Sequence, residues 1–309
     1  MSVHRIHVET PLFESLALSR CVAGRVWLKL EALQPCGSFK ARGIGFACQR
    51  YLERGRKRFV SSSGGNAGLA VAYSGRQLGV SVTVVVPEST SERAKQLIRD
   101  ESAEVIVWGQ SWHEAHQHAL TLVDGEAAYL HPFDDPLIWE GHASLIDEVL
   151  AAGLKPDAVV LSVGGGGLLC GVAEGLRRAG LSEVIIVTAE TIGAESFYKT
   201  MQAGELVELE RISSVATTLG AKQVARQALE VSRTFRVMPY VVTDREAIEA
   251  CLRFADDHRI VVEPACGAAL ALVYKNVDAL KDAEDILLIV CGGAGVNYEK
   301  LVELKEGAV

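Results

Sequence analysis

The sequence predicts an α/β fold in which parallel strands alternate with helices. Short runs rich in β-branched residues alternate with longer amphipathic segments, and glycine-rich turns follow three of these runs. The chain has 309 residues, 49 % hydrophobic and 23 % charged, an ordinary globular composition with enough length for about two domains. The expected strands are Arg25–Leu30, Phe59–Ser61, Val80–Val86, Glu104–Val107, Ala158–Ser162, Val184–Thr188, Tyr240–Val242 and Ile286–Cys291.

Helices are expected between these strands, because amphipathic stretches of helical length separate them. They are Ala67–Leu78, Glu92–Asp100, Trp112–Leu122, Ala143–Ala152, Leu168–Arg178 and Arg245–His258. Parallel sheets bind ligands beyond the carboxyl ends of their strands, where loops lead into helices. The residues that follow each strand are therefore the first place to look for a functional site.

Composition and charge narrow the class of protein. The net charge of −8 disfavours a nucleic-acid-binding protein. No apolar run reaches the ~18 residues that a membrane helix needs, and the N-terminus lacks the apolar stretch of a signal peptide. The seven cysteines form no Cys-x-x-Cys pair, so free thiols are expected. We expect a cytoplasmic protein that acts on a small molecule, with no nucleic-acid or membrane partner.

Four successive glycines, Gly164 to Gly167, stand between a strand and a helix. Backbone N–H groups and the helix dipole at such a turn favour an anion, above all a phosphate. The P-loop pattern fails because Leu168 and Leu169 follow, and the dinucleotide pattern fails because Leu169 stands where its third glycine should be. A dinucleotide-binding oxidoreductase is kept as an alternative. The three glycine-rich strand ends hold 10 of the 29 glycines.

Lys40 follows an aromatic residue near a predicted helix start, where the helix dipole would keep its amine neutral and nucleophilic. Two further strand ends carry Ser62-Ser63-Gly64-Gly65-Asn66-Ala67-Gly68 and Cys291-Gly292-Gly293. A cofactor with both an aldehyde and a phosphate needs a lysine, a phosphate cradle and polar groups of this kind.

Together these stretches resemble the fold-type II pyridoxal-phosphate enzymes, and within them the L-serine/L-threonine dehydratases, or serine ammonia-lyases. The resemblance implies a two-domain, tryptophan-synthase-β-like fold with twisted, mostly parallel sheets flanked by helices. It implies a small domain of residues 38–134, a large domain of residues 1–37 plus 135–309, and a homodimer. It is carried by Ser38–Gly43, Ser62–Gly68, Phe133–His142, Leu161–Gly171, Glu263–Ala269 and Val290–Gly293.

The resemblance also implies roles for individual residues toward pyridoxal 5'-phosphate. Lys40 would form the Schiff base and act as general base, Phe39 would pack on the pyridine ring, and Asn66 would bond the ring hydroxyl. Cys291 would face the ring nitrogen, and a thiol there would not keep that nitrogen protonated, which suits elimination. The phosphate would be held by Gly164, Gly165, Gly166, Gly167 and Leu168. The substrate would be bound by Ser63, Gly64, Gly65, Asn66, Ala67 and Phe133, with Ser63 also a candidate catalytic acid.

The family binds a monovalent cation, potassium or sodium. The matching positions are the Glu190 carboxylate and the backbone oxygens of Gly164, Ala194, Leu219 and Ala221. Two residues depart from the pattern of the best-known dehydratases. Gly64 stands where they often have alanine, and Thr218 stands where a small residue commonly covers the ring.

The expected reaction is α,β-elimination of L-serine or L-threonine to pyruvate or 2-oxobutyrate and ammonia. Within the family, a serine racemase, a cysteine synthase or another β-replacement enzyme is the alternative. A non-catalytic binding protein is the alternative from another class, and the presence of Lys40 disfavours it. His113, His116 and His118 are expected on a solvated helix face rather than in a metal site, because residues five apart do not share a face.

Overall fold

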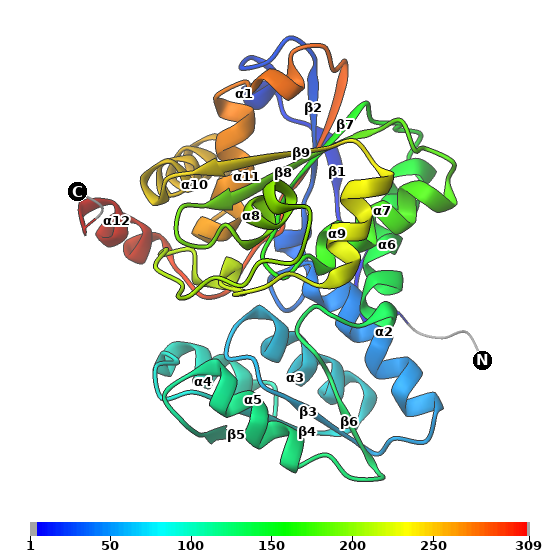
Figure 1. The fold of residues 1–309 in the computed structure, drawn as a ribbon, viewed down its shortest axis with the longest axis vertical. Coiled ribbons are helices and arrows are strands. Elements are labelled where there is room, and N and C mark those ends of the chain that lie inside the picture. The colour runs from blue at the N-terminus through cyan, green and yellow to red at the C-terminus, as the bar shows by residue number, and fades with distance from the viewer. Residues whose placement is uncertain (1–4, 308–309) are drawn as a thin grey trace.

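The computed structural model describes residues 5–307 and contains two separate β-sheets, each flanked by helices (Figure 1). Residues 1–4 and 308–309, the two ends of the expected large domain, lie outside the described residues. The six-stranded sheet has the order β1-β2-β10-β7-β8-β9, and the four-stranded sheet has the order β5-β4-β3-β6. No helix among residues 5–307 is long and apolar enough to cross a membrane.

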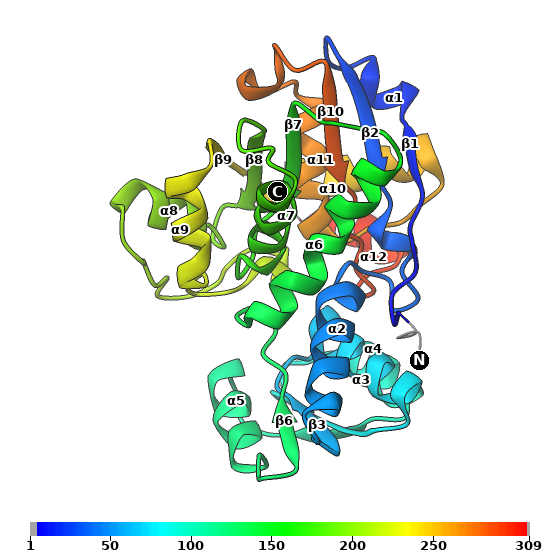
Figure 2. The ribbon, with the colours of Figure 1, turned by 90° about the vertical axis from the view of Figure 1, so that its right-hand side faces the viewer.

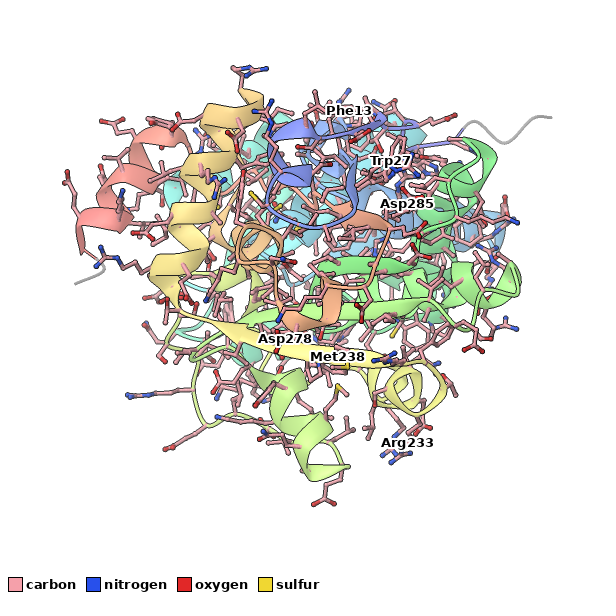
Figure 3. All side chains as sticks on the ribbon, turned by 90° about the horizontal axis from the view of Figure 1, so that it is seen from above. Phe13, Trp27, Arg233, Met238, Asp278 and Asp285 are labelled. Carbon is pink, nitrogen blue, oxygen red and sulfur yellow. The ribbon has the colours of Figure 1, made fainter. Side chains whose placement is uncertain are left out.

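The six-stranded sheet is parallel except for its edge strand β1, which pairs antiparallel with β2. Its central strand β7 is buried along its whole length, as a strand covered on both faces must be. The Asp285 carboxylate bonds both Arg25 and Trp27 at the start of the β2–β10 pair, and Figure 3 shows Trp27 and Asp285 near one another. The strands are β1 (Leu12–Glu14), β2 (Arg25–Lys29), β7 (Ala158–Ser162), β8 (Ile185–Thr191), β9 (Val237–Val242) and β10 (Asp285–Ile289).

Helices cover both faces of this sheet (Figure 2). Helix α11 (Pro264–Tyr274) packs along β7, β8 and β9 and is covered by α10 (Asp244–His258), while α6 (Pro136–Ala151) and α7 (Gly167–Arg178) pack together on the other face. Proline at the first position of α6 and α11 and a Thr243–Glu246 capping box on α10 explain where these helices begin. The remaining elements of this part are α1 (Leu16–Ser19), α8 (Ser196–Ala203), α9 (Arg226–Thr234), α12 (Tyr298–Gly307) and the 3-10 turns Glu31–Leu33, Thr217–Leu219 and Asp278–Leu280.

The four-stranded sheet is wholly parallel and has a hydrophobic cluster on each face. Phe59 and Val84 point to the cluster under α2 and α3, whereas their neighbours Val60 and Val85 point to the cluster under α5. Its elements are β3 (Arg58–Ser61), α3 (Asn66–Leu78), β4 (Ser81–Val86), α4 (Glu92–Asp100), β5 (Glu104–Val107), α5 (Trp112–Thr121) and β6 (Ala127–Tyr129).

Helix α2 (Lys40–Glu53) connects the two parts of the molecule, packing against α6 on one side and α3 on the other (Figure 2). Its Arg42 is fully buried and bonds the carboxylates of Glu31 and Glu148 at 2.6–2.8 Å. Lys29 bonds the same Glu148 at 2.6 Å. Two buried cations, Arg42 and Lys29, are therefore paired with two buried carboxylates, and their charges balance.

The predicted class of parallel-rich sheets flanked by helices is confirmed. Strands β5 and β7 and helix α4 begin and end where the sequence predicted, but β1 and β6 were not predicted. The predicted start of the helix Ala143–Ala152 is wrong, because the observed helix α6 begins at Pro136 and is capped by Asp135. Cys291 lies beyond the end of β10 rather than within the strand. We propose the division into residues 38–134 and the remainder, because the four-stranded sheet lies wholly within that range.

Candidate active site

The glycine loop follows β7 and opens α7. Gly166 occupies the helix N-cap with φ +89°, a left-handed conformation that favours glycine. The N–H of Cys170 bonds the carbonyl of Gly166 at 2.9 Å and closes the first turn of α7. The N–H groups that precede Cys170 in this first turn are thus free to face an anion, as at other helix N-termini.

Phe133 lies directly against this loop. A Cβ atom added to Gly165 or Gly167 would come within 3.0 Å of Phe133, closer than real Cβ atoms come to other atoms. Trp139 donates its indole N–H to the Phe133 carbonyl at 2.8 Å, and His131 packs edge-on against the Phe133 ring. The glycines of the loop therefore make room for an aromatic side chain as well as for a ligand.

Lys40 is the first residue of α2, and its Nζ donates to the carbonyl of Pro132 at 2.6 Å. Burial lowers the pKa of Lys40 to about 8, while the negative charge of the Glu263 carboxylate opposes this shift. The sequence placed the lysine correctly at a helix start, but the main cause of its lowered pKa is loss of water. Phe39 lies beside it, with Lys40 Nζ 5.1 Å from the ring centroid.

The end of β10 is bonded to the segment that carries Lys40. The N–H of Phe39 bonds the carbonyl of Cys291 at 3.2 Å, and the N–H of Gly293 bonds the carbonyl of Gly37 at 2.8 Å. The Cys291 thiol is buried, and its contact with the Cys266 thiol, together with burial, raises its pKa well above the usual value. Cys291 is therefore a protonated thiol at neutral pH. All seven cysteines are free.

The loop after β3 places Ser63, Gly64 and Gly65 before Asn66, the first residue of α3. The Ser63 hydroxyl accepts from the N–H of Gly65 at 3.3 Å, so the loop turns tightly around it. Asn66 donates to the Glu263 carboxylate at 2.7 Å and accepts from the N–H of Ala294 at 3.1 Å. Asn66 thus joins three segments that are far apart in the sequence.

Glu263 is a residue of this site that the sequence reasoning missed. It accepts from Thr218 at 2.5 Å as well as from Asn66, and burial raises its pKa to about 7. In the sequence it precedes Pro264, a pattern typical of a helix start, and only its place in the resembling Glu263–Ala269 stretch could have indicated more.

Glu190 lies on β8 next to the glycine loop, since its neighbour Ala189 pairs with Ser162 and accepts from the N–H of Val163. Its buried carboxylate accepts from the backbone N–H groups of Phe197 and Tyr198 at 2.7–2.8 Å. Burial raises its pKa to about 8. Among the other expected cation ligands, Ala194 and Leu219 are buried, Ala221 is half-buried, and Leu219 lies against Gly164.

The three histidines of α5 do not converge on one point. His118 stacks on Trp108, and His116 stacks on Trp112 and bonds the hydroxyl of Tyr129 at 2.7 Å. No group of three or more metal-ligating side chains is found within residues 5–307. The hydroxyl of Tyr129 also bonds Ser62 at 2.6 Å, so this cluster supports the loop after β3.

Comparison with known proteins places the chain in a family. Residues 3–292 match the family described as "Pyridoxal-phosphate dependent enzyme". The chain belongs to this family of pyridoxal-phosphate dependent enzymes. The enzyme is 47 % identical to the "L-serine dehydratase/L-threonine deaminase" of Bos taurus, over 99 % of this chain and 97 % of the relative. It is 49 % identical to the "Serine dehydratase-like" protein of Mus musculus, over 97 % and 94 %.

A solved structure agrees with these relatives. The crystal structure of a fungal L-serine ammonia-lyase from Rhizomucor miehei superposes with a TM-score of 0.93 at 37 % identity, and the match covers 99 % of this enzyme and all of that chain. The predicted fold-type II architecture is therefore confirmed. The predicted dinucleotide-binding alternative finds no support in these matches.

The residues present in this enzyme fit pyridoxal phosphate. The glycine loop leaves backbone donors free at a helix start, and Lys40 is a buried amine whose pKa of about 8 lies close to physiological pH. The protonated thiol of Cys291 is a weak polar group, and the amide of Asn66, bonded to Glu263, is a neutral one. A phosphate, an aldehyde and an uncharged ring nitrogen would all meet suitable partners.

Proposed function

We propose that this enzyme catalyses the α,β-elimination of L-serine, and of L-threonine, to pyruvate or 2-oxobutyrate and ammonia. The observation that carries the proposal is the buried amine of Lys40 at the start of α2. Its Nζ bonds the carbonyl of Pro132, the residue before Phe133, and the neighbouring Phe39 is bonded to Cys291 at the end of β10. The activities named for its full-length relatives at 45–49 % identity support the same reaction.

Lys40 is the proposed base. An amine with a pKa near 8 is partly neutral at pH 7 and can accept the α-proton of the substrate at Nζ. The carbonyl of Pro132, 2.6 Å from Nζ, orients the amine and stabilises the ammonium that forms. Phe39 beside Nζ is proposed to cover one face of the cofactor ring.

The glycine loop is proposed to hold the cofactor phosphate, through the N–H groups of Gly164, Gly165, Gly166, Gly167 and Leu168. Asn66 is proposed to donate to the ring hydroxyl, and Cys291 to face the ring nitrogen. When bound, pyridoxal phosphate supplies an electron sink for the charge that develops at the substrate α-carbon. Because the Cys291 thiol is protonated and uncharged, it does not place a carboxylate-like charge beside that nitrogen.

The loop after β3 is proposed to bind the substrate carboxylate through Ser63, Gly64, Gly65, Asn66 and Ala67, because a turn of successive N–H groups forms a concave anion site. The Ser63 hydroxyl is proposed to protonate the departing β-hydroxyl, so that water leaves as the Cα–H and Cβ–O bonds break. The proton that Lys40 takes from the α-carbon would then return to Ser63, and addition of water to the eliminated product would give the keto acid and ammonia. Phe133 is proposed to close the pocket beside the glycine loop, which excludes solvent from the reacting atoms.

A monovalent cation, potassium or sodium, is proposed at Glu190. Its carboxylate is buried, and within residues 5–307 its hydrogen-bond donors are the backbone N–H groups of Phe197 and Tyr198, so a cation would offset the cost of its charge. Backbone oxygens of Gly164, Ala194, Leu219 and Ala221 would complete the site.

A cytoplasmic homodimer is also proposed, on the resemblance alone, and light scattering on the purified protein would give its mass.

The experiment is product analysis on protein loaded with pyridoxal phosphate. L-Serine should give pyruvate without any other reactant, and Lys40→Ala should abolish both pyruvate and the visible absorbance that the cofactor gains on binding the lysine. Lys155→Ala, an exposed lysine, is the matched control and should change neither. Product that appears only with O-acetylserine and sulfide would favour a synthase, and D-serine without pyruvate would favour a racemase.

A further inference from the structure

Glu263 stands at the N-cap of α11, yet its side chain does not cap the helix. The residue is only 5 % exposed, and its Oε1 accepts from two side chains, Asn66 at 2.7 Å and Thr218 at 2.5 Å. A buried carboxylate that does not cap its helix needs other hydrogen-bond donors, and for Glu263 these donors are Asn66 and Thr218. One oxygen thus connects α11, α3 and the 3-10 turn Thr217–Leu219.

The two partners of Asn66 fix which way its amide points. Its Oδ1 accepts from the N–H of Ala294 at 3.1 Å, while its Nδ2 donates to Glu263. A carboxylate accepts and a backbone N–H donates, so a flipped amide would place two donors together and two acceptors together. One hydrogen of Nδ2 remains unbonded, so Asn66 can donate it to a ligand while its amide keeps this orientation.

The glycines after β10 are shaped around Glu263. A Cβ at Gly293 would lie within 3.0 Å of the Glu263 carboxyl carbon, and a Cβ at Gly295 would lie 3.4 Å from Oε2. Gly293 also has φ +127°, which L side chains rarely adopt. Gly293, which belongs to one of the glycine-rich strand ends in the sequence, is therefore needed to accommodate the Glu263 carboxylate.

The charged and titratable groups near Glu263 come from three elements. Lys40 on α2 attracts its carboxylate, whereas Cys291 after β10 and Cys251 on α10 are buried and protonated. Lys40 is thus the only cation shown to act on Glu263 among the described residues. The carboxylate and the amine stabilise each other's charge across the site.

We propose that Glu263 is a positioning residue, which holds Asn66 as a hydrogen-bond donor toward an oxygen of the bound cofactor and orients Thr218 at the same time. This inference rests on the proposed function, because the cofactor oxygen is the ligand that Asn66 would meet. Glu263 contacts neither cofactor nor substrate in this account and acts through its two partners.

The test measures cofactor affinity and absorbance rather than turnover. Glu263→Leu removes the acceptor and should weaken pyridoxal-phosphate binding by about 10- to 100-fold, the usual size of a lost charged hydrogen bond, and shift the visible band. Glu263→Gln keeps one acceptor oxygen and should retain most of the affinity. Glu205→Gln, at an exposed glutamate, is the control and should leave both readouts unchanged.

A double-mutant cycle shows whether Glu263 acts through Asn66. In an Asn66→Ala background, Glu263→Leu should change the cofactor dissociation constant less than threefold, because the amide that Glu263 orients is gone. Additive losses, or a Glu263→Leu protein with unchanged affinity and spectrum, would overturn the inference. If Glu263→Leu fails to fold, the same cycle is measured with Glu263→Met, which also removes the acceptor oxygens but keeps the length of the side chain. Failure of the proposed function is distinct, since the unaltered protein would then bind the cofactor without producing pyruvate.

Discussion

The buried amine of Lys40 should destabilise the protein when the cofactor is absent. Burial lowers its pKa from the ordinary 10.5 to about 8, so at pH 7 the folded apoprotein must hold an ammonium that it solvates poorly. At about 1.4 kcal/mol per pKa unit, the difference corresponds to about 3 kcal/mol. This figure is an upper bound because part of the Lys40 residue is exposed to water, which screens the charge on its amine.

The variant Lys40→Met removes the charge and keeps the length of the side chain. It also removes the hydrogen bond from the ammonium to Pro132, and such a charge-assisted bond stabilises the folded state by about 1.5 kcal/mol or more. The net expectation at pH 7 is that the free energy of unfolding of the apo-variant exceeds that of the unaltered apoprotein by at most about 1.5 kcal/mol. A gain of this size from deleting a catalytic group is the opposite of what most substitutions do.

The pH dependence of the unfolding free energy is a second test of whether Lys40 destabilises the apoprotein. Between pH 8 and 10.5 the unfolded chain keeps a proton on Lys40 that the folded chain has released, so the stability of the unaltered apoprotein rises with pH in this range. The stability advantage of Lys40→Met should therefore shrink from at most about 1.5 kcal/mol at pH 7 to zero or below at pH 10.

The measurement is urea unfolding of both apoproteins at pH 7, 8, 9 and 10, with Lys155→Met as a control that should differ from the unaltered protein by less than about 0.5 kcal/mol. The reasoning fails if Lys40→Met is less stable at pH 7, or if its advantage is the same at pH 7 and pH 10.

Three further predictions follow from the contacts of the site. Gly165→Ala should lower the melting temperature and weaken cofactor binding at least tenfold, because its Cβ would overlap the Phe133 ring, whereas Gly125→Ala, whose Cβ meets open space, should change neither. Gly64→Ala should reduce kcat/KM, because its Cβ would lie 2.7 Å from Thr90; a second change, Thr90→Ala, should restore it, and additive losses would contradict this coupling. Potassium should raise the melting temperature of the unaltered protein but not of Glu190→Gln; an equal response in both, measured against choline chloride, would exclude Glu190 as the ligand.

The elements that the sequence predicted well are those whose signals are local. The run Ala158–Ser162 is apolar, β-branched and bounded by glycine, and Glu92–Asp100 follows a serine that caps it. Strand β6 has only three residues, two of them alanine, so neither its length nor its composition distinguishes it from a loop. The start of α6 was missed because Phe133–His142 was taken as a family motif rather than as a capped helix.

The site shows the same limit at the level of single residues. Lys40, Asn66 and the glycine loop follow strands or open helices, where a local pattern indicates a ligand. The role of Glu263 depends on Asn66, 197 residues away, and on Thr218, 45 residues away, and no spacing in the sequence encodes such contacts. The cause of the lowered Lys40 pKa was likewise invisible, because burial is a property of the assembled fold.

The buried ion network at the start of α2 has a mechanical consequence. Arg42, two residues after Lys40, is bonded to Glu31 and Glu148 of the larger part of the molecule. The catalytic amine is therefore fixed to the larger part, although its helix runs on into the smaller one. A movement of the smaller part that leaves this network intact would have to bend α2 beyond Arg42, and it would also have to break the bonds of Asn66 to Glu263 and Ala294. Lys40 would keep its contact with Pro132 only if that segment stayed in place as well.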